Sequence, residues 1–268
     1  MTLGETEIEQ AAEDLFLADE NRRQIGLLTL RHPQMEMDDA YAVQAALVRR
    51  KLEAGRGVIG WKIGLTSKAM QYALDIDIPD SGVLLDDMAF ENGATVPAGR
   101  FIQPRIEAEI AFVMKAPLAG SDVTRDDVIA ATDFVAPSLE ILDTRILRAD
   151  PETGQARKIC DTISDNAANA GLVLGGERHP VDAFDLRWVG AIVSRNGAVE
   201  ETGLGAGVLN DPVTGIVWLA HRMADYGQRI EPGQVILSGS FIRPVECPSG
   251  SKIRADFGTF GTVSCNFA

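Results

Sequence analysis

Hydrophobic and polar positions divide the chain into an N-terminal part with a helical period and a longer part with the pattern of β-strands. Residues 8–23 are rich in Ala, Leu, Glu and Asp, a composition that favours a helix. A second helix is predicted over 38–53, because Asp38 or Asp39 is a good N-cap and apolar residues follow at one-turn intervals. Gly55 then ends this helix.

From residue 58 onward, short β-rich runs alternate with turns of Gly, Pro and Asp. Asn196-Gly197 is typical of a tight hairpin. One strong helix interrupts the strands: Asn210 or Asp211 caps it and Pro212 begins it. The predicted strands are 58–63, 89–90, 106–114, 134–141, 170–174, 188–195, 235–238 and 262–267.

The strands are not separated by regular helices, so the pattern does not favour a doubly wound sheet. It favours an α+β protein with a helical N-terminal segment over 1–75 and a rolled mixed β-sheet domain over 76–268. We find no repeat, no low-complexity stretch and no clear linker in the chain.

Charge and composition narrow the class of protein. The 268 residues hold 39 acids and 25 bases, a net charge of −14, which argues against binding nucleic acid or an anionic membrane surface. No run is apolar enough to span a bilayer, and the acidic N-terminus has no apolar signal core. Three widely spaced cysteines show no disulfide or zinc spacing, so we expect a cytoplasmic protein with reduced thiols.

Three glutamates carry the strongest chemical signal. Glu107 and Glu109 lie two apart in one apolar, strand-like run, and Glu140 lies in another. Residues two apart in a strand point to the same face, so the first two carboxylates would repel each other unless a cation or a shared proton lies between them. Burying unpaired carboxylates is costly, and a hard divalent cation would relieve that cost. The alternative is a strand face that meets water.

Three other residues are candidates for catalysis. Lys62 lies among glycines and apolar residues, where it could neutralise an anion or transfer a proton, or be an edge-strand lysine in water. Asp80 lies in a predicted turn, as a cap of that turn or as a general base. Ser164 lies in a run of small polar residues, either a surface loop or a loop that presents this serine to a ligand.

Four segments together resemble the hydratase/decarboxylase family of meta-cleavage pathways, within the fumarylacetoacetate hydrolase superfamily. The resemblance extends over nearly the whole chain. It implies the rolled mixed β-sheet of the fumarylacetoacetate hydrolase C-terminal type, a site for Mg²⁺ or Mn²⁺ at Glu107, Glu109 and Glu140, and an active site that includes Lys62 and Asp80 with Ser164. The segments are Gly60-Trp61-Lys62-Ile63-Gly64-Leu65-Thr66-Ser67, Pro104-Arg105-Ile106-Glu107-Ala108-Glu109, Ser164-Asp165-Asn166-Ala167 and Asp256-Phe257-Gly258.

The resemblance also implies a reaction. Residues 150–154, 161–171 and 239–244 are more similar to hydratases of this family that act on a dicarboxylate, whereas Trp61 is more usual in the decarboxylases. We expect hydration of a 2-hydroxy-2,4-dienoate or its 2-oxo tautomer, with Arg105 and Arg243 as candidates for the second carboxylate of 2-oxohept-4-ene-1,7-dioate. Both arginines could instead be structural and exposed.

Alternatives and partners follow from the same resemblance. The rival activities are decarboxylation of 2-oxohex-3-enedioate and hydration of 2-oxopent-4-enoate; a non-catalytic partner subunit is a further alternative. Members of the family usually form rings, which implies a homo-oligomer, a pentamer or a decamer, and possible association with enzymes of the same pathway. The expected ligand is a small 2-oxo acid, with neither nucleic acid nor membrane as a partner.

Overall fold

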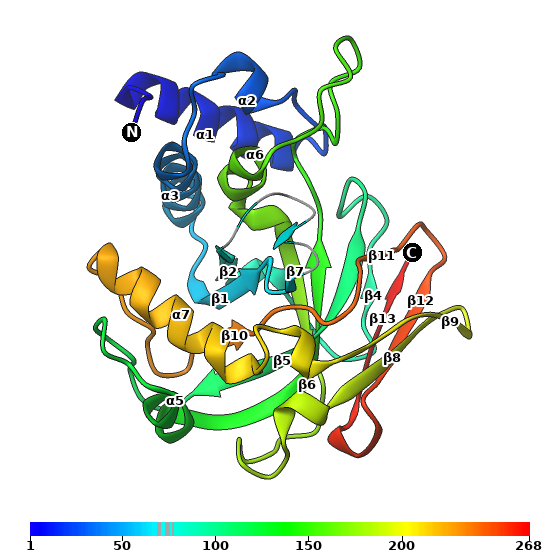
Figure 1. Cartoon of the computed structure of the whole chain (residues 1–268). Coiled ribbons are helices and arrows are strands. Elements are labelled where there is room, and N and C mark those ends of the chain that lie inside the picture. The colour runs from blue at the N-terminus through cyan, green and yellow to red at the C-terminus, as the bar shows by residue number, and fades with distance from the viewer. Residues whose placement is uncertain (69–70, 73–75, 77) are drawn as a thin grey trace.

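The computed structural model describes residues 1–68, 71–72, 76 and 78–268. Helices gather at the N-terminal end, and one long helix packs on the strands (Figure 1). Within the described residues the α-helices are α1 (Glu5–Glu20), α2 (Leu28–Arg31), α3 (Met37–Glu53), α5 (Arg125–Ala131), α6 (Ile159–Ser164) and α7 (Pro212–Asp225).

The larger sheet mixes parallel and antiparallel pairs. Its order is β2-β1-β10-β5-β6-β7-β3, with β11 also paired to β5. β1 runs parallel to β10, whereas β10, β5, β6 and β7 are successively antiparallel. The strands are β1 (Val58–Gly64), β2 (Asp80–Leu85), β3 (Ala89–Phe90), β5 (Arg105–Met114), β6 (Thr132–Leu142), β7 (Asn169–Leu174), β10 (Val235–Leu237) and β11 (Val245–Glu246).

The smaller sheet has the order β4-β13-β12-β8-β9. Its hairpin between β8 and β9 turns at Asn196 and Gly197, both with positive φ, as the sequence predicts. The strands are β4 (Thr95–Val96), β8 (Gly190–Arg195), β9 (Ala198–Leu204), β12 (Lys252–Asp256) and β13 (Thr262–Phe267).

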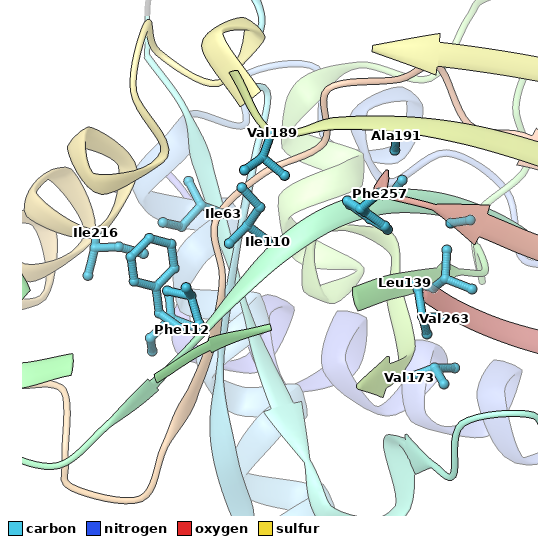
Figure 2. Packing of buried hydrophobic residues seen from close by; sticks show 14 of the residues in the cluster. Ile63, Ile110, Phe112, Leu139, Val173, Val189, Ala191, Ile216, Phe257 and Val263 are labelled. Atoms are coloured by element: carbon cyan, nitrogen blue, oxygen red, sulfur yellow. The ribbon is translucent and has the colours of Figure 1, made fainter. Parts of the chain in front are cut away.

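The main hydrophobic core lies where α7 and the smaller sheet pack against β5 and β6 (Figure 2). Alternate residues of β5, including Ile110 and Phe112, enter this core with Ile216 of α7 and Val263 of β13. Because side chains of a strand alternate between its faces, residues 107 and 109 of β5 are left on the opposite face. The core therefore fixes the strand that carries two of the three glutamates.

The N-terminal helices form a second core with residues from the loop after β6 and from α6. No helix in the described residues is long and apolar enough to cross a membrane. The predicted boundary after residue 75 falls outside the described residues. β1, on the N-terminal side of that boundary, pairs with β2 and β10 from the other side.

Most predicted elements are confirmed, and two predictions about local structure are wrong. The turn predicted at Asp80 is the start of β2, which pairs with β1. The loop predicted around Ser164 is helix α6 followed by a short 3₁₀ turn over 166–168. Sequence patterning also missed the two-residue strands β4 and β11 and the five-residue strand β12.

Candidate active site

The pairing of β5 with β6 brings the three glutamates together. Glu107 lies directly opposite Glu140 in the antiparallel register, and Glu109 lies opposite Ser138. One carboxylate oxygen from each of Glu107, Glu109 and Glu140 lies within 4.8 Å of the other two. Glu109 and Glu140 are fully buried and Glu107 is half-buried, so this face of the strands does not simply meet water.

The carboxylate oxygens are poorly satisfied by the protein. The backbone N–H of Gly239 donates to Glu109 Oε2 at 2.7 Å. Glu109 Oε1 and both oxygens of Glu140 are buried and have no hydrogen-bond partner among the described residues. A buried carboxylate oxygen without a partner is unfavourable. Three carboxylates that each place one oxygen within 4.8 Å of the others form a donor set suited to a hard divalent cation.

Burial and mutual repulsion oppose ionisation of these acids. Burial, with the Glu140 carboxylate beside it, raises the pKa of Glu107 from 4.5 to about 8. Burial also raises the pKa of Glu109, and the neighbouring Glu140 and Glu107 raise it further. Burial raises the pKa of Glu140, although the Lys62 ammonium opposes the change. In the absence of a cation the cluster therefore retains protons near neutral pH.

Lys62 supplies positive charge to the cluster. It lies on β1, is 4% exposed, and its Nζ is 3.5 Å from Glu140 Oε1, an ion-pair distance rather than a good hydrogen bond. Burial lowers the pKa of Lys62, but the carboxylates of Glu140 and Asp80 outweigh it and the net change is upward. Lys62 is therefore a fixed cation in the site, and the alternative of an edge lysine in water does not hold.

Asp80 lies on the neighbouring strand, next to Lys62. In the register Gly64 faces Asp80, and a Cβ at position 64 would lie 2.2 Å from Asp80 Oδ1 and 2.9 Å from Lys62 Nζ. Only glycine leaves room for these two groups. Asp80 Oδ1 is buried without a partner among the described residues. Burial raises the pKa of Asp80, and Lys62 limits the rise.

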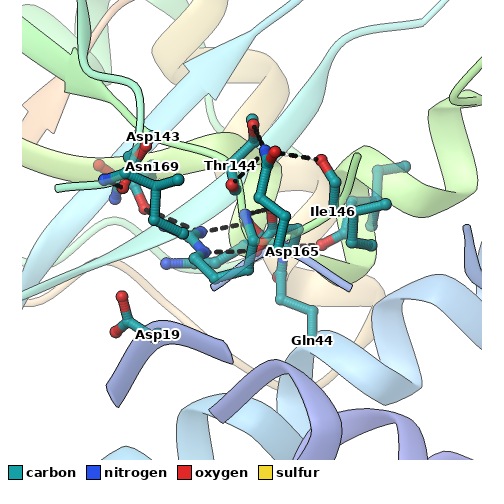
Figure 3. Close-up of polar contacts among 12 residues, drawn as sticks. Asp19, Gln44, Asp143, Thr144, Ile146, Asp165 and Asn169 are labelled. Atoms are coloured by element: carbon teal, nitrogen blue, oxygen red, sulfur yellow. Dashed lines mark hydrogen bonds and ion pairs between the residues drawn. The ribbon is translucent and has the colours of Figure 1, made fainter. Parts of the chain in front are cut away.

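Ser164 ends α6, and its buried Oγ has no partner among the described residues. The segment after it is held by Arg145, which binds both the side chain and the carbonyl of Asp165 and also the carbonyl of Asn169 (Figure 3). Asn166 exchanges two hydrogen bonds with the backbone of Val83 on β2, at 2.8 and 2.9 Å. These contacts tie the Ser164 segment to the strand that begins with Asp80.

A cavity of about 560 Å³ opens beside the carboxylates. Five of the predicted residues line it, whereas Glu109, Glu140 and Ser164 are not among its lining residues; the five are Lys62, Asp80, Arg105, Glu107 and Arg243. The Arg243 side chain is 81% exposed and its Nη2 pairs with Glu201 at 2.6 Å. The structure therefore gathers most of the predicted residues in one site, with Arg243 at its exposed margin.

Sequence reasoning missed several residues of this cavity. Arg157, Lys158, Thr162 and Phe241 also line it. Arg157 and Lys158 lie in a hydrophilic run whose composition is typical of a surface segment, so no local signal identifies them as cavity residues. Phe241 lies in the segment 239–244 that the resemblance included, but only Arg243 of that segment was given a role.

The chain has an α+β fold that it shares with proteins of the fumarylacetoacetate hydrolase type. Fumarylpyruvate hydrolase from Pseudomonas aeruginosa, in complex with Mn²⁺ and pyruvate, shares the fold with a TM-score of 0.57 at 12% identity, over 78% of this chain and 88% of that one. The chain matches no protein-family model.

Similarity to two other proteins is much greater. The chain is 51% identical over 256 residues to 2-oxo-hept-4-ene-1,7-dioate hydratase of Escherichia coli, covering 96% of each. It superposes on 4-oxalocrotonate decarboxylase from Pseudomonas putida G7, complexed with magnesium and adipate, with a TM-score of 0.93 at 34% identity, over 100% and 99% of the two chains. The chain belongs to the hydratase/decarboxylase family of meta-cleavage pathways.

Proposed function

We propose that this enzyme is a Mg²⁺-dependent hydratase that adds water to 2-oxohept-4-ene-1,7-dioate, forming 4-hydroxy-2-oxoheptanedioate in aromatic degradation. The observation that carries the metal-dependent chemistry is the convergence of three carboxylates, two of which have buried oxygens without a hydrogen-bond partner among the described residues. Full-length identity of 51% to a hydratase named for this substrate, against 34% for the decarboxylase, supports the choice of reaction.

Glu107, Glu109 and Glu140 would hold the cation. Mg²⁺ is the first choice because these ligands are oxygens and a related structure is complexed with magnesium; Mn²⁺ is the alternative. When bound, the cation would stabilise negative charge that develops on the C2 oxygen of the substrate. Lys62 adds a second positive charge on the same side of the cavity.

Asp80 is the proposed acid and base. Hydration of the dienol moves the proton of the C2 hydroxyl to C5, and water then adds its hydroxyl at C4 and its remaining proton at C3. Burial raises the pKa of Asp80, which favours its protonated form relative to an exposed aspartate and suits a group that donates and accepts protons. Ser164, with its unpartnered hydroxyl, is proposed to orient a water or a substrate oxygen.

Decarboxylation of 2-oxohex-3-enedioate is the second candidate, because it requires stabilisation of the same kind of charge. Trp61, the residue that favours it, donates to Gln234 at 3.1 Å and is absent from the lining of the active-site cavity. Its presence therefore says little about the reaction, and hydration of 2-oxopent-4-enoate is a further alternative.

The test is turnover of purified enzyme with Mg²⁺ on each of the three substrates. We expect loss of the dienol absorbance and formation of the 4-hydroxy-2-oxo product from the seven-carbon dioate, without release of CO₂. Release of CO₂ from 2-oxohex-3-enedioate at a higher kcat/KM would assign the enzyme as a decarboxylase instead. No turnover of any substrate would favour a non-catalytic subunit.

We also propose that the protein is a cytoplasmic homo-oligomer, a pentamer or decamer, that could associate with other enzymes of its pathway. The support is the family resemblance, and sedimentation of the purified protein would measure the assembly.

A further inference from the structure

Two arginines face each other at the base of a hairpin beside the active-site cavity. The backbone N–H of Arg157 donates to the carbonyl of Arg148 at 2.9 Å, and Ala149 pairs with Ala156 in an antiparallel bridge. This register places Arg148 directly opposite Arg157. The hairpin is the green loop that extends beside the N-terminal helices in Figure 1. Like charges directly opposite each other destabilise a strand pair, so the arrangement needs another explanation.

Arg105 adds a third guanidinium to this pair. Arg105 and Arg157 both line the active-site cavity, whereas Arg105 and Arg148 both line an adjoining cavity of about 590 Å³. Arg105 is therefore common to the walls of the two cavities, with one hairpin arginine on each side. We refer to Arg105, Arg148 and Arg157 as the arginine cluster.

The nearby acids neutralise the arginine cluster only in part. Burial and the charge of Arg148 lower the pKa of Arg105, although Glu107 and Glu246, the latter directly opposite Arg105 in the register of β11, oppose the change. The carboxylate of Asp165 is bound by Arg145, and the carboxylate of Asp143 accepts from the backbone N–H groups of Ile102 and Gln103. No member of the cluster forms an ion pair with any acid in the described part of the chain. In a protein with a net charge of −14, an unpaired group of cations at a cavity wall indicates a site for an anion.

Burial and mutual repulsion both destabilise the positive charges of the arginine cluster. Burial lowers the pKa of Arg157, and the positive charges of Arg105 and Arg148 lower it further, although Asp165 opposes them. Arg157 Nη1 also donates to the carbonyl of Ile146 at 3.3 Å, which fixes the guanidinium in place. An anion among the three guanidiniums would relieve the repulsion and accept several charge-assisted hydrogen bonds.

The distance to the glutamates fits a dicarboxylate. Arg105 and Glu107 lie two residues apart on β5 and line the same cavity, so they are separated by about 7 Å along the strand. This is comparable to the extended length of a chain of six or seven carbons. A molecule with its 2-oxo acid end at the glutamates would place a far carboxylate near Arg105.

We propose that the arginine cluster binds the second carboxylate of a dicarboxylic 2-oxo acid and so selects it over substrates with an uncharged tail. The proposal rests on the proposed function, and it adds two residues that no sequence signal identified. Arg243, the other candidate for this carboxylate, is already paired with Glu201 and mostly exposed, which makes it the weaker choice.

Binding of unreactive ligands tests the cluster independently of turnover. We would titrate 2-oxoheptanedioate and 2-oxoheptanoate into the Mg²⁺-loaded enzyme by calorimetry. Wild type should bind the dicarboxylate at least about tenfold more tightly. Arg148→Gln and Arg157→Gln should each remove most of that preference without weakening binding of the monocarboxylate. Arg229→Gln, an exposed arginine paired with Glu231, is the matched control and should change neither affinity.

The outcomes separate the two proposals. If wild type shows no preference, or if the preference survives in both variants, the cluster does not bind the second carboxylate. Thermal unfolding distinguishes a structural role: relief of like-charge repulsion should leave Tm unchanged or raised, whereas a fall in Tm with equal loss of both ligands would overturn the proposal. If the enzyme prefers the dicarboxylate but does not hydrate the dioate, the binding role of the arginine cluster is supported and the proposed reaction is contradicted.

Discussion

At the scale of single residues, the site depends on two glycines, whose lack of a side chain leaves room for the polar groups beside them. Gly64 has no side chain, so Lys62 Nζ and Asp80 Oδ1 can approach its Cα. Gly239, at φ +116, donates its N–H to Glu109 while a Cβ there would clash with Thr66. The sequence showed these glycines, but which side chains they make room for depends on long-range strand pairing that no local pattern specifies.

Asp80→Asn tests the acid–base role. The amide keeps the shape of the side chain but cannot transfer a proton, so we expect kcat to fall by about a hundredfold or more with little change in the affinity for 2-oxoheptanedioate. Steady-state kinetics and calorimetry on the same preparation give both quantities. A rise in KM alone, with kcat preserved, would make Asp80 a binding residue only.

At the scale of elements, alternation along β5 correctly predicted that its two glutamates share one face of the strand. Glu107 and Glu109 were expected on one face, and the structure places them there with Glu140 opposite on β6. The prediction succeeded because the apolar side chains of β5 fill the core on one face of the strand, which leaves Glu107 and Glu109 on the opposite face. It failed at Asp80 and Ser164, where Pro79 and a run of small polar residues gave the composition of a turn or loop, but contacts with distant strands determined the structure.

The turn over 166–168 is the element that joins Ser164 to β2. Asn166, Ala167 and Ala168 all have positive φ, which is unfavourable for residues other than glycine. Asn166 offsets this with two hydrogen bonds to Val83. Asparagine tolerates this backbone region better than alanine does, so two effects oppose Asn166→Ala.

We therefore expect Asn166→Ala to lower the free energy of unfolding by about 2–4 kcal/mol, from two lost buried hydrogen bonds and added strain. Urea unfolding followed by circular dichroism measures the change. Gln10→Ala, which removes an exposed contact with Asp14, is the control and should stay within about 0.5 kcal/mol of wild type. A similar small effect at Asn166 would show that the turn is held by other contacts.

At the scale of the whole molecule, the buried acids link stability to pH and to metal. Burial and Glu140 raise the pKa of Glu107 from 4.5 in an unfolded chain to about 8 in the fold. Below pH 4.5 the carboxyl of Glu107 is protonated in both the folded and the unfolded state, so its contribution to stability is fully present. As pH rises toward 8 the unfolded state releases its proton more readily, so the metal-free fold loses this contribution to stability.

A divalent cation needs the ionised carboxylates, so it should reverse that loss. We expect the gain in Tm on adding Mg²⁺ to EDTA-treated protein to be small at about pH 5 and to grow toward about pH 8. Differential scanning calorimetry at a series of pH values measures it. Glu109→Gln should abolish the gain while the protein still unfolds cooperatively. A gain that is independent of pH, or retained in the variant, would place the cation elsewhere.

Two members of the arginine cluster, Arg148 and Arg157, lie on a different part of the chain from the glutamates, whereas Arg105 shares β5 with Glu107 and Glu109. The acids lie on strands paired on both sides and backed by the core, whereas two of the three arginines lie on a peripheral hairpin. Mutations in the hairpin could therefore change the preferred substrate tail without changing the residues that carry out the reaction. A descendant could exchange or shorten residues 148–157 and adopt a new carbon source while its reaction centre stayed intact.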